Sequence, residues 1–325
     1  MTMKKRNLTG SPSDAVTSRE TEHRQLSRIA AAEGMVLLRN IENTLPIAKG
    51  SRIALYGAGA EITIKGGIGS GDVNSRDTVS VRQGLEQAGY QLTSLDWLND
   101  FRALYERQRL IWRDTILNAF AQPEYNGNFF RAYTEHPFAI PCGRPLTQAE
   151  MTSGTNDTAI FVLSRCAGEA ADRKDEPGDY QLTAEEHTLL MQISQAHAKV
   201  VLVLNTGSLI DLSFTDTIPN ITAILYMVQG GQESGSALAD LISGDVVPSG
   251  KLTDSWTYRY EDYPNAEFFG SRFCDAWKAE YREDIYVGYR YFDTFQVPVR
   301  YGFGFGLSYT EFFLTPGKLS SEGGN

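Results

Sequence analysis

Cysteine is scarce in this sequence. Only 3 of the 325 residues are cysteines, and they lie far apart at positions 142, 166 and 274. They form no Cys-x-x-Cys pair, and no histidine lies at the spacing of a metal site. We therefore expect neither a disulfide framework nor a zinc centre, and we interpret Cys142, Cys166 and Cys274 as buried free thiols. No pattern in the chain implies a metal or an organic cofactor.

The sequence also lacks a long apolar segment and an excess of basic residues. Residues 1–22 form a polar leader with no apolar stretch behind its basic start, and no later segment is as long as a membrane span. We therefore expect a cytoplasmic protein without a membrane partner. The 40 acidic residues outnumber the 30 basic ones, which gives a formal net charge of -10. This balance disfavours binding to nucleic acid or anionic lipid and leaves neutral and cationic ligands open.

The usual nucleotide-binding motifs are incomplete. Residues 57–62 begin like a dinucleotide fingerprint, but Ile62 occupies the third glycine position and no helix is expected to open there. Gly230 and Gly235 have the spacing of a phosphate loop, but Ser236 replaces its lysine. Phosphoryl transfer is therefore not expected. A nucleotide-dependent enzyme remains only as a distant alternative, because doubly wound folds support many functions.

Apolar runs alternate with helical patterns along most of the chain. Runs typical of strands buried on both faces occupy residues 52–57, 158–163, 200–204 and 221–228. Helical patterns occupy residues 79–88, 184–198 and 234–242, and an earlier helix over residues 23–40 runs into a loop. Thr183 and Glu186 match a capping box, which marks a helix start. Parallel strands need crossover helices, so the alternation predicts an α/β fold with functional residues just after its strands.

Two segments interrupt this alternation. Residues 97–150 are aromatic, basic and helical in pattern, and we interpret them as an insertion. Trp97 and Trp112 in this insertion are interpreted as packing residues and not as a sugar platform, because aromatic side chains are usually buried. From Pro248 onward the pattern is irregular and rich in tyrosine and phenylalanine, and the last six residues are expected to be disordered.

A dense glycine cluster follows the first predicted strand. Residues 65–72 read Lys-Gly-Gly-Ile-Gly-Ser-Gly-Asp, which is too rich in glycine for the interior of a helix or strand. Two interpretations remain open. The segment is either a loop whose N–H groups and Ser70 border a pocket, or a tight turn between a strand and a helix.

A second candidate loop follows the predicted strand at residues 158–163. Residues 164–173 read Ser-Arg-Cys-Ala-Gly-Glu-Ala-Ala-Asp-Arg, and their carboxylate Glu169 lies where this fold presents groups to ligands. A buried carboxyl group in this position can stay protonated and serve as a general acid. The alternative is a solvated charge run, since Arg165, Asp172 and Arg173 are followed by further charged residues.

Several stretches resemble the α/β sandwich domain of the β-glucosidases of glycoside hydrolase family three. The matching stretches are residues 31–40, 44–47, 64–74, 163–173, 178–186, 200–207, 229–256, 285–295 and 301–310. The resemblance implies an (α/β)6-sandwich with a mostly parallel sheet over residues 23–310, which includes the helical insertion. It also implies a retaining glycosidase that acts on a β-glucoside or an oligosaccharide.

The resemblance assigns roles residue by residue. It implies that Glu169 is the general acid/base, with Ser70, Asp172 and Arg173 as candidate substrate-binding residues. The nucleophile of the family is an aspartate on a separate (β/α)8 barrel, and we find neither that motif nor room for a barrel in this chain. Residues 254–256, Asp-Ser-Trp, are interpreted as packing and receive no catalytic role.

These implications lead to an incomplete enzyme as the leading hypothesis. Residues 311–325 are interpreted as a truncated linker or tail, and the chain alone is expected to show little hydrolysis. The alternative is a non-catalytic domain that binds carbohydrate or a partner such as a separate barrel. Ala170 and Asp284 each replace a glycine that is commoner in the family.

Overall fold

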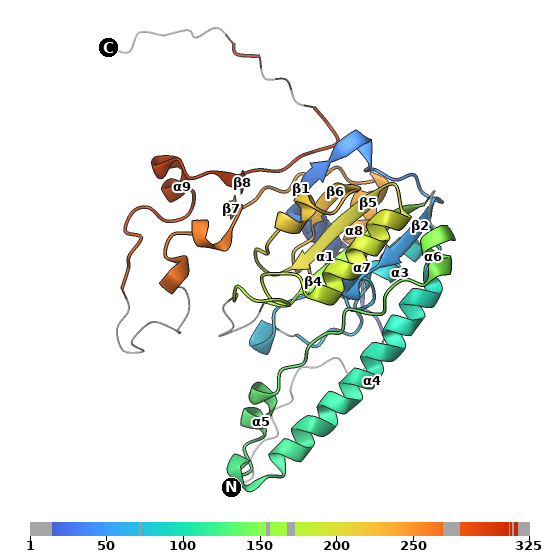
Figure 1. Ribbon diagram of the computed structural model, residues 1–325. Coiled ribbons are helices and arrows are strands. Elements are labelled where there is room, and N and C mark those ends of the chain that lie inside the picture. The colour runs from blue at the N-terminus through green and yellow to red at the C-terminus, as the bar shows by residue number, and fades with distance from the viewer. Residues whose placement is uncertain are drawn as a thin grey trace.

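The computed structural model describes residues 15–71, 73–153, 157–167, 173–268, 280–311, 313 and 315–317, with the side chains of Ser70 and Ser153 excepted. Within these residues a sheet of six strands forms the centre of the molecule (Figure 1). Its order is β1 (Val36–Asn40), β6 (Ile221–Tyr226), β5 (Val200–Thr206), β4 (Thr158–Arg165), β2 (Arg52–Tyr56) and β3 (Gln91–Leu92). β1 is antiparallel to β6, and all other neighbours are parallel. The predicted α/β fold with a mostly parallel sheet is confirmed.

The central strands consist mainly of aliphatic side chains. Every residue of β5 is buried, and β4 is buried from its second residue onward. Strands covered by helices on both faces need apolar side chains on both faces, and so they appear in the sequence as continuous apolar runs. The four predicted strands are confirmed as β2, β4, β5 and β6.

Helices cover both faces of this sheet. α7 (Ala184–Ala196) lies in front of the sheet in Figure 1 and contacts α6 (Gln148–Ser153). Behind the sheet, α8 (Ser234–Ser243) contacts both α1 (Ser18–Gly34) and α3 (Val81–Gln87). α1, α3 and α7 each begin with a capping box, in which a hydroxyl side chain accepts a hydrogen bond from a free backbone N–H group. The capping box predicted at Thr183 and Glu186 is confirmed.

Two local predictions are wrong. The helix predicted over residues 23–40 is α1, which begins at Ser18 and ends at Gly34, and residues 36–40 form β1. A short apolar run does not distinguish a helix from a buried strand, and pairing with β6 satisfies the backbone groups of residues 36–40. A short helix, α2 (Ala58–Glu61), also opens directly after β2, where none was expected.

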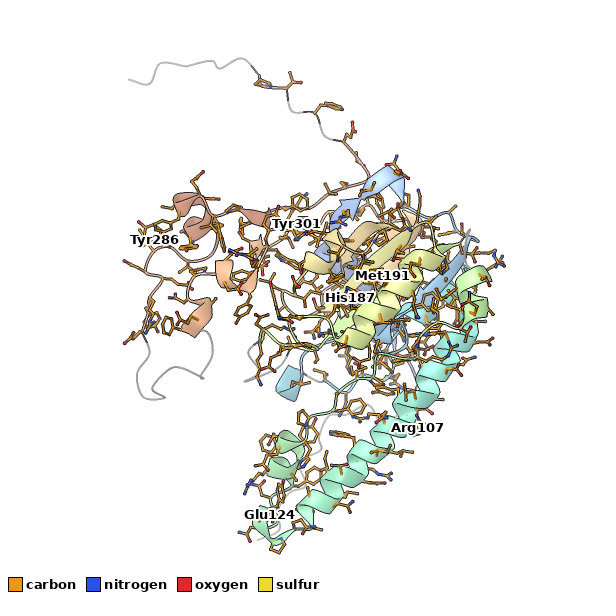
Figure 2. All side chains as sticks on the ribbon, viewed as in Figure 1. Arg107, Glu124, His187, Met191, Tyr286 and Tyr301 are labelled. Carbon is orange, nitrogen blue, oxygen red and sulfur yellow. The ribbon has the colours of Figure 1, made fainter. Side chains whose placement is uncertain are left out.

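The insertion is a helical arm, defined here as residues 95–145. Its long helix α4 (Leu95–Phe120) leaves the sheet and ends at a tip, where α5 (Phe129–Glu135) packs against it (Figure 1). At the base, Trp97 is completely buried and stacks on Phe101 in the main core. The prediction that Trp97 is a packing residue is confirmed. The tip, where Figure 2 labels Glu124, has a small hydrophobic cluster of its own.

The C-terminal part is irregular and aromatic, as predicted. We define the aromatic lobe as residues 254–268 and 280–305; it lies to one side of the sheet in Figure 1. It contains the strand pair β7 (Trp256–Thr257) and β8 (Val299–Tyr301) and the helix α9 (Tyr289–Phe295). Arg300 joins the lobe to the sheet domain through two hydrogen bonds to Asp216. Asp284 adopts a φ of 49°, a left-handed conformation that favours glycine.

Candidate functional site

The buried side chain of Asn205 connects two segments that follow neighbouring parallel strands. Asn205, near the end of β5, is fully buried. Its Nδ2 donates hydrogen bonds to the carbonyl oxygens of Ile64 at 3.0 Å and Val228 at 2.7 Å. Its Oδ1 accepts one from the N–H of Ile64 at 2.7 Å. Asn205 therefore fixes the start of the glycine-rich loop against the end of β6.

The glycine-rich loop lies beside the loop that follows β4. The N–H of Ile68 donates to the carbonyl oxygen of Ala167 at 3.1 Å, and the N–H of Gly231 donates to that of Lys65 at 2.9 Å. The two candidate loops predicted from the sequence are therefore neighbours in space. The side chain of Ser70 lies outside the described part of the structure, so its role as a pocket residue stays a prediction.

Arg165 anchors the start of the loop that contains Glu169. This last residue of β4 is buried, and its guanidinium binds both carboxylate oxygens of Glu186 at 2.7 and 2.6 Å. It also donates to the carbonyl oxygens of Ser164 at 2.8 Å and Asp179 at 3.0 Å. A bidentate pair of this kind fixes both position and orientation. The start of the loop is therefore held against the N-terminus of α7.

Arg173 anchors the other end of the same loop. Its Nη1 donates to Asp179 at 2.5 Å, and its Nε donates to the hydroxyl of Ser208 at 2.9 Å. Its side chain is only 13% exposed. Lys174, Asp175 and Glu176 are exposed, so the alternative of a solvated charge run holds for these three residues but not for Arg165 or Arg173.

Glu169 and Asp172 lie outside the described residues. The structure describes the two ends of their loop, which Arg165 and Arg173 hold in place. In the sequence these arginines were recognised only as members of a charge run. The sequence does contain a signal for this anchoring role, namely the carboxylates that pair with the two arginines. Glu186 belongs to the predicted capping box, and Asp179 lies shortly before that box in the chain. The roles of Glu169 as acid and of Asp172 and Arg173 as substrate-binding residues stay predictions.

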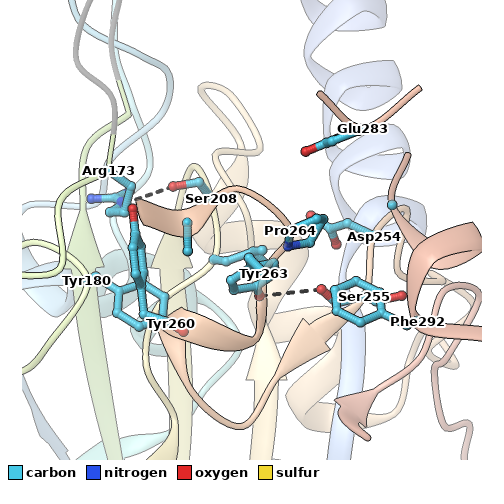
Figure 3. A pocket seen from close by; sticks show the side chains of 13 residues that line it. Arg173, Tyr180, Ser208, Asp254, Ser255, Tyr260, Tyr263, Pro264, Glu283 and Phe292 are labelled. Carbon is cyan, nitrogen blue, oxygen red and sulfur yellow. Dashed lines mark hydrogen bonds between the residues drawn. The ribbon is translucent and has the colours of Figure 1, made fainter. Parts of the chain in front are cut away.

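A cavity of about 360 Å³ separates this loop end from the aromatic lobe (Figure 3). Arg173, Tyr180 and Ser208 line it from the sheet domain. The lobe lines it with the acidic residues Asp254 and Glu283 and with aromatic side chains that include Tyr260, Tyr263 and Phe292. The rings of Tyr180 and Tyr260 meet edge to face at 5.2 Å, as do those of Tyr263 and Phe292 at 6.1 Å. Aromatic walls with a few polar groups are typical of a binding pocket.

Asp254 lines this cavity, although the sequence interpretation gave residues 254–256 a packing role. Trp256 and Ser255 are buried, as the predicted packing role requires, but Asp254 faces the cavity and accepts a hydrogen bond from Trp256 Nε1 at 3.2 Å. The residue is exposed to solvent as a whole, but protein atoms around its carboxylate partly desolvate that group, which raises the pKa of Asp254 above its usual value.

Cysteines and possible metal ligands give no further site in the described part of the chain. The thiols of Cys142 and Cys166 are half-buried, and burial raises the pKa of the Cys142 thiol to about 12. Cys274 lies outside the described residues. Among the residues that are described, no group of three or more His, Cys, Asp or Glu side chains could hold a metal ion. The same part of the chain has no helix that is long and apolar enough to cross a membrane.

The fold identifies this chain as an α/β sandwich domain. Its two candidate loops place a possible ligand site at the carboxyl ends of the parallel strands. Residues 35–309 match the family model of the glycosyl hydrolase family 3 C-terminal domain. This chain therefore belongs to glycoside hydrolase family 3, as one of its C-terminal domains.

Similar proteins agree with this family. The chain is 34% identical to beta-glucosidase A of Butyrivibrio fibrisolvens over 94% of its own length, and 34% identical to a beta-glucosidase of Ruminococcus albus over 90%. The structure of beta-glucosidase 3B from Thermotoga neapolitana, in complex with glucose, matches with a TM-score of 0.70 and 36% identity over 90% of the chain. The chain spans only 37%, 28% and 39% of these three proteins, respectively.

Proposed function

We propose that this chain supplies the general acid/base of a retaining β-glucosidase, which hydrolyses O-glycosyl bonds in carbohydrate metabolism. One observation supports this most strongly. The loop that contains Glu169 begins at the carboxyl end of β4, and Arg165 and Arg173 fix its two ends within a domain of this family. The substrate proposed is a β-glucoside or an oligosaccharide.

The proposed reaction needs two carboxyl groups on opposite sides of the glycosidic bond. Glu169 as the acid would protonate the leaving oxygen while a nucleophilic carboxylate attacks the anomeric carbon, with the two groups about 5–5.5 Å apart in retaining enzymes. Glu169 would then act as a base toward the water that releases the sugar. Within this proposal the nucleophile comes from a (β/α)8 barrel, and the chain alone has little activity because an acid without a positioned nucleophile provides only part of the catalysis.

The test measures hydrolysis of an aryl β-glucoside by the chain alone, by the barrel domain of beta-glucosidase A from B. fibrisolvens, and by their mixture. We expect activity only in the mixture. Glu169→Ala should abolish that activity, and added azide should restore turnover of substrates with good leaving groups. The control Glu176→Ala changes an exposed carboxylate of the same segment and should leave activity unchanged. Robust hydrolysis by the pure chain, or full activity of Glu169→Ala, would contradict the proposal.

A second candidate function is a non-catalytic domain that binds carbohydrate or a partner. The cavity with aromatic walls favours it, because such a cavity can bind a ligand without any chemistry. The same mixing experiment separates the two functions. A complex that forms with the barrel but hydrolyses the glucoside equally well with Glu169→Ala would support the binding function.

A further inference from the structure

One side of the helical arm carries apolar side chains that nothing covers among the described residues. Trp112 and Ile116 lie on the side of α4 that forms the hydrophobic cluster of the arm tip. Leu110, Ile111 and Leu117 point away from that side, because successive residues of a helix are about 100° apart. Their exposed fractions are 53%, 53% and 49%, and none of the three belongs to a hydrophobic cluster of the described residues. α4 is therefore apolar on two sides, of which only one is covered.

The exposed side of α4 has the spacing of a helix that packs along another helix. We define the arm stripe as six exposed residues of this side: Ala103, Arg107, Leu110, Ile111, Asp114 and Leu117. Ala103, Leu110 and Leu117 follow one another at intervals of seven residues, and so do Arg107 and Asp114. The two series alternate at steps of four and three, which is the heptad spacing of paired helices. The arm stripe therefore predicts a second helix as its partner.

The two charged residues of the arm stripe are available to such a partner. Arg107 forms no ion pair with any residue that the structure describes. Asp114 pairs with its neighbour Arg113 at 2.9 Å, and both of these side chains are 59% exposed. A pair so exposed contributes little stability, so the carboxylate of Asp114 can exchange its partner at small cost.

The order of these charges makes the arm stripe complementary to itself. Arg107 lies three residues before Leu110, and Asp114 lies three residues after Ile111. If two α4 helices run antiparallel about a two-fold axis between Leu110 and Ile111, Arg107 of each copy faces Asp114 of the other. A parallel pair would instead place each charge opposite its own copy, and like charges in contact are unfavourable. The charge pattern therefore favours a second copy of this chain in the antiparallel orientation.

We propose that the arm stripe is a homodimer interface, in which the α4 helices of two copies of this chain pack antiparallel. Figures 1 and 2 show that α4 leaves the sheet domain, with Arg107 on the part that projects. Two copies can therefore lie along each other over this part while their sheet domains stay at opposite ends of the helix pair. The net charge of -10 disfavours nucleic acid or anionic lipid as the occupant. The proposal does not depend on the proposed glycosidase function.

The length of the arm stripe sets the strength of this dimer. Residues 103–117 span about 20 Å of helix at about 1.5 Å per residue. A single pair of helices of this length gives an interface at the small end of the specific ones, below about 1,200 Å². We therefore expect a reversible dimer with a Kd of about 1–100 µM.

The first experiment is sedimentation velocity of the chain from about 1 to 200 µM, a range that brackets this affinity. The dimer fraction of the wild type should rise with concentration. Leu110→Ser and Leu117→Ser should each raise the Kd about tenfold or more, because each removes apolar area from the centre of the interface. Phe130→Ser on α5 is the matched control, since its side chain is 73% exposed but lies outside the arm stripe. The urea midpoints of all three variants should equal that of the wild type, which shows that the fold is retained.

The second experiment exchanges the facing charges. Arg107→Asp and Asp114→Arg should each raise the Kd about tenfold or more, because each places like charges opposite one another. An equimolar mixture of these two variants should dimerise about as well as the wild type, since every facing pair then has opposite charges again. The double variant Arg107→Asp/Asp114→Arg should dimerise for the same reason. Glu124→Arg, which reverses an exposed charge at the arm tip outside the arm stripe, should leave the Kd unchanged.

Three results would overturn the proposal. The first is a wild-type chain that sediments as a monomer over the whole concentration range. The second is a dimer that Leu110→Ser and Leu117→Ser leave intact, or that Phe130→Ser weakens as much as they do. The third is a mixture of Arg107→Asp and Asp114→Arg that stays monomeric, because the antiparallel pairing requires these two variants to complement each other. None of these results bears on Glu169, whose role has its own test.

Discussion

At the scale of single residues, Asn205 connects two loops of the candidate site. Its side chain makes three hydrogen bonds to backbone groups of the glycine-rich loop and of the segment after β6, and none of its atoms is exposed. A buried backbone group that loses its partner costs about 1–3 kcal/mol. Loop positions at this edge of the sheet therefore depend on a buried polar side chain near the end of β5.

We predict that Asn205→Leu lowers the free energy of unfolding by about 3 kcal/mol or more, because it leaves the N–H of Ile64 and two carbonyl groups unpaired. Urea denaturation measures this loss. Hydrogen exchange should show faster exchange at the Ile64 amide in particular. Asn118→Leu on the exposed arm is the control and should stay within about 0.5 kcal/mol. An unchanged Ile64 exchange rate would contradict the role of Asn205.

A second prediction at this scale concerns acid stability. Hydrogen bonds from Arg144, with a further one from the backbone of Thr147, lower the pKa of Glu150 to about 2. Its ordinary value is 4.5, so the ion pair contributes fully above about pH 5.5 and progressively less as the pH falls through 4.5 toward 2. Because both side chains are partly exposed, we expect a contribution of about 2 kcal/mol.

Urea denaturation of the wild type and of Glu150→Gln from pH 7 down to pH 3 tests this prediction. The difference between the two free energies of unfolding should be constant above about pH 5.5 and should shrink at lower pH. Glu106→Gln, which changes an exposed carboxylate of the arm, controls for the general effect of removing a negative charge. A difference that does not depend on pH would show that the ion pair with Arg144 is not its source.

At the scale of elements, glycine allows two helices to pack closely behind the sheet. A Cβ atom on Gly235 of α8 would overlap the backbone carbonyl of Ser80, which caps α3, and a Cβ atom on Gly84 of α3 would overlap the backbone of Gly235. The two helices are therefore in backbone contact. Their spacing in turn sets where α3 and the glycine-rich loop before it can lie.

We predict that Gly235→Ala forces α3 and α8 apart and lowers the free energy of unfolding by about 1–3 kcal/mol. The change adds a side chain with better helix propensity, so a loss of stability can come only from the packing. Gly34→Ala is the matched control, because no atom lies within 4 Å of the Cβ that it would add. Thermal unfolding of both variants measures the effect, and equal midpoints would show that the helices can separate without cost.

The elements that could be predicted from the sequence are those marked by a pattern of neighbouring residues. β2, β4, β5 and β6 are continuous apolar runs, and α7 starts at a capping box, so neighbouring residues were enough to find them. β1 was missed because only its pairing with β6 makes it a strand. Arg165 looked like part of a charged surface because its partner Glu186 lies 21 residues further along the chain. The position of Asp254 on a cavity wall could not be predicted, because the cavity exists only once the aromatic lobe packs against the sheet domain.

At the scale of the whole molecule, the hydrophobic core is divided unequally. The main core includes the sheet, its covering helices and the base of the arm, where Trp97, Leu98 and Phe101 are buried. Ile116, Tyr125 and Ala132 form a separate small cluster at the arm tip. Tyr105 and Ile140 mark the boundary, since both still pack against the main core. The outer arm therefore packs mainly on itself.

We predict that replacing residues 106–139 by a short Gly–Ser linker leaves the rest of the chain folded and cooperative. The deletion removes the tip cluster but keeps Tyr105 and Ile140, whose chain segments lie close together because Tyr105 contacts Phe138 at 5.6 Å. The free energy of unfolding should change by about 1–2 kcal/mol at most, since the buried apolar area of the main core is retained. Fluorescence of the buried Trp97 and Trp256 during urea denaturation measures this directly.

Trp97→Ala in the full chain provides the contrast, because a large cavity in the main core should cost about 3–5 kcal/mol. A shortened chain that unfolds without a cooperative transition would show that the arm is an integral part of the core.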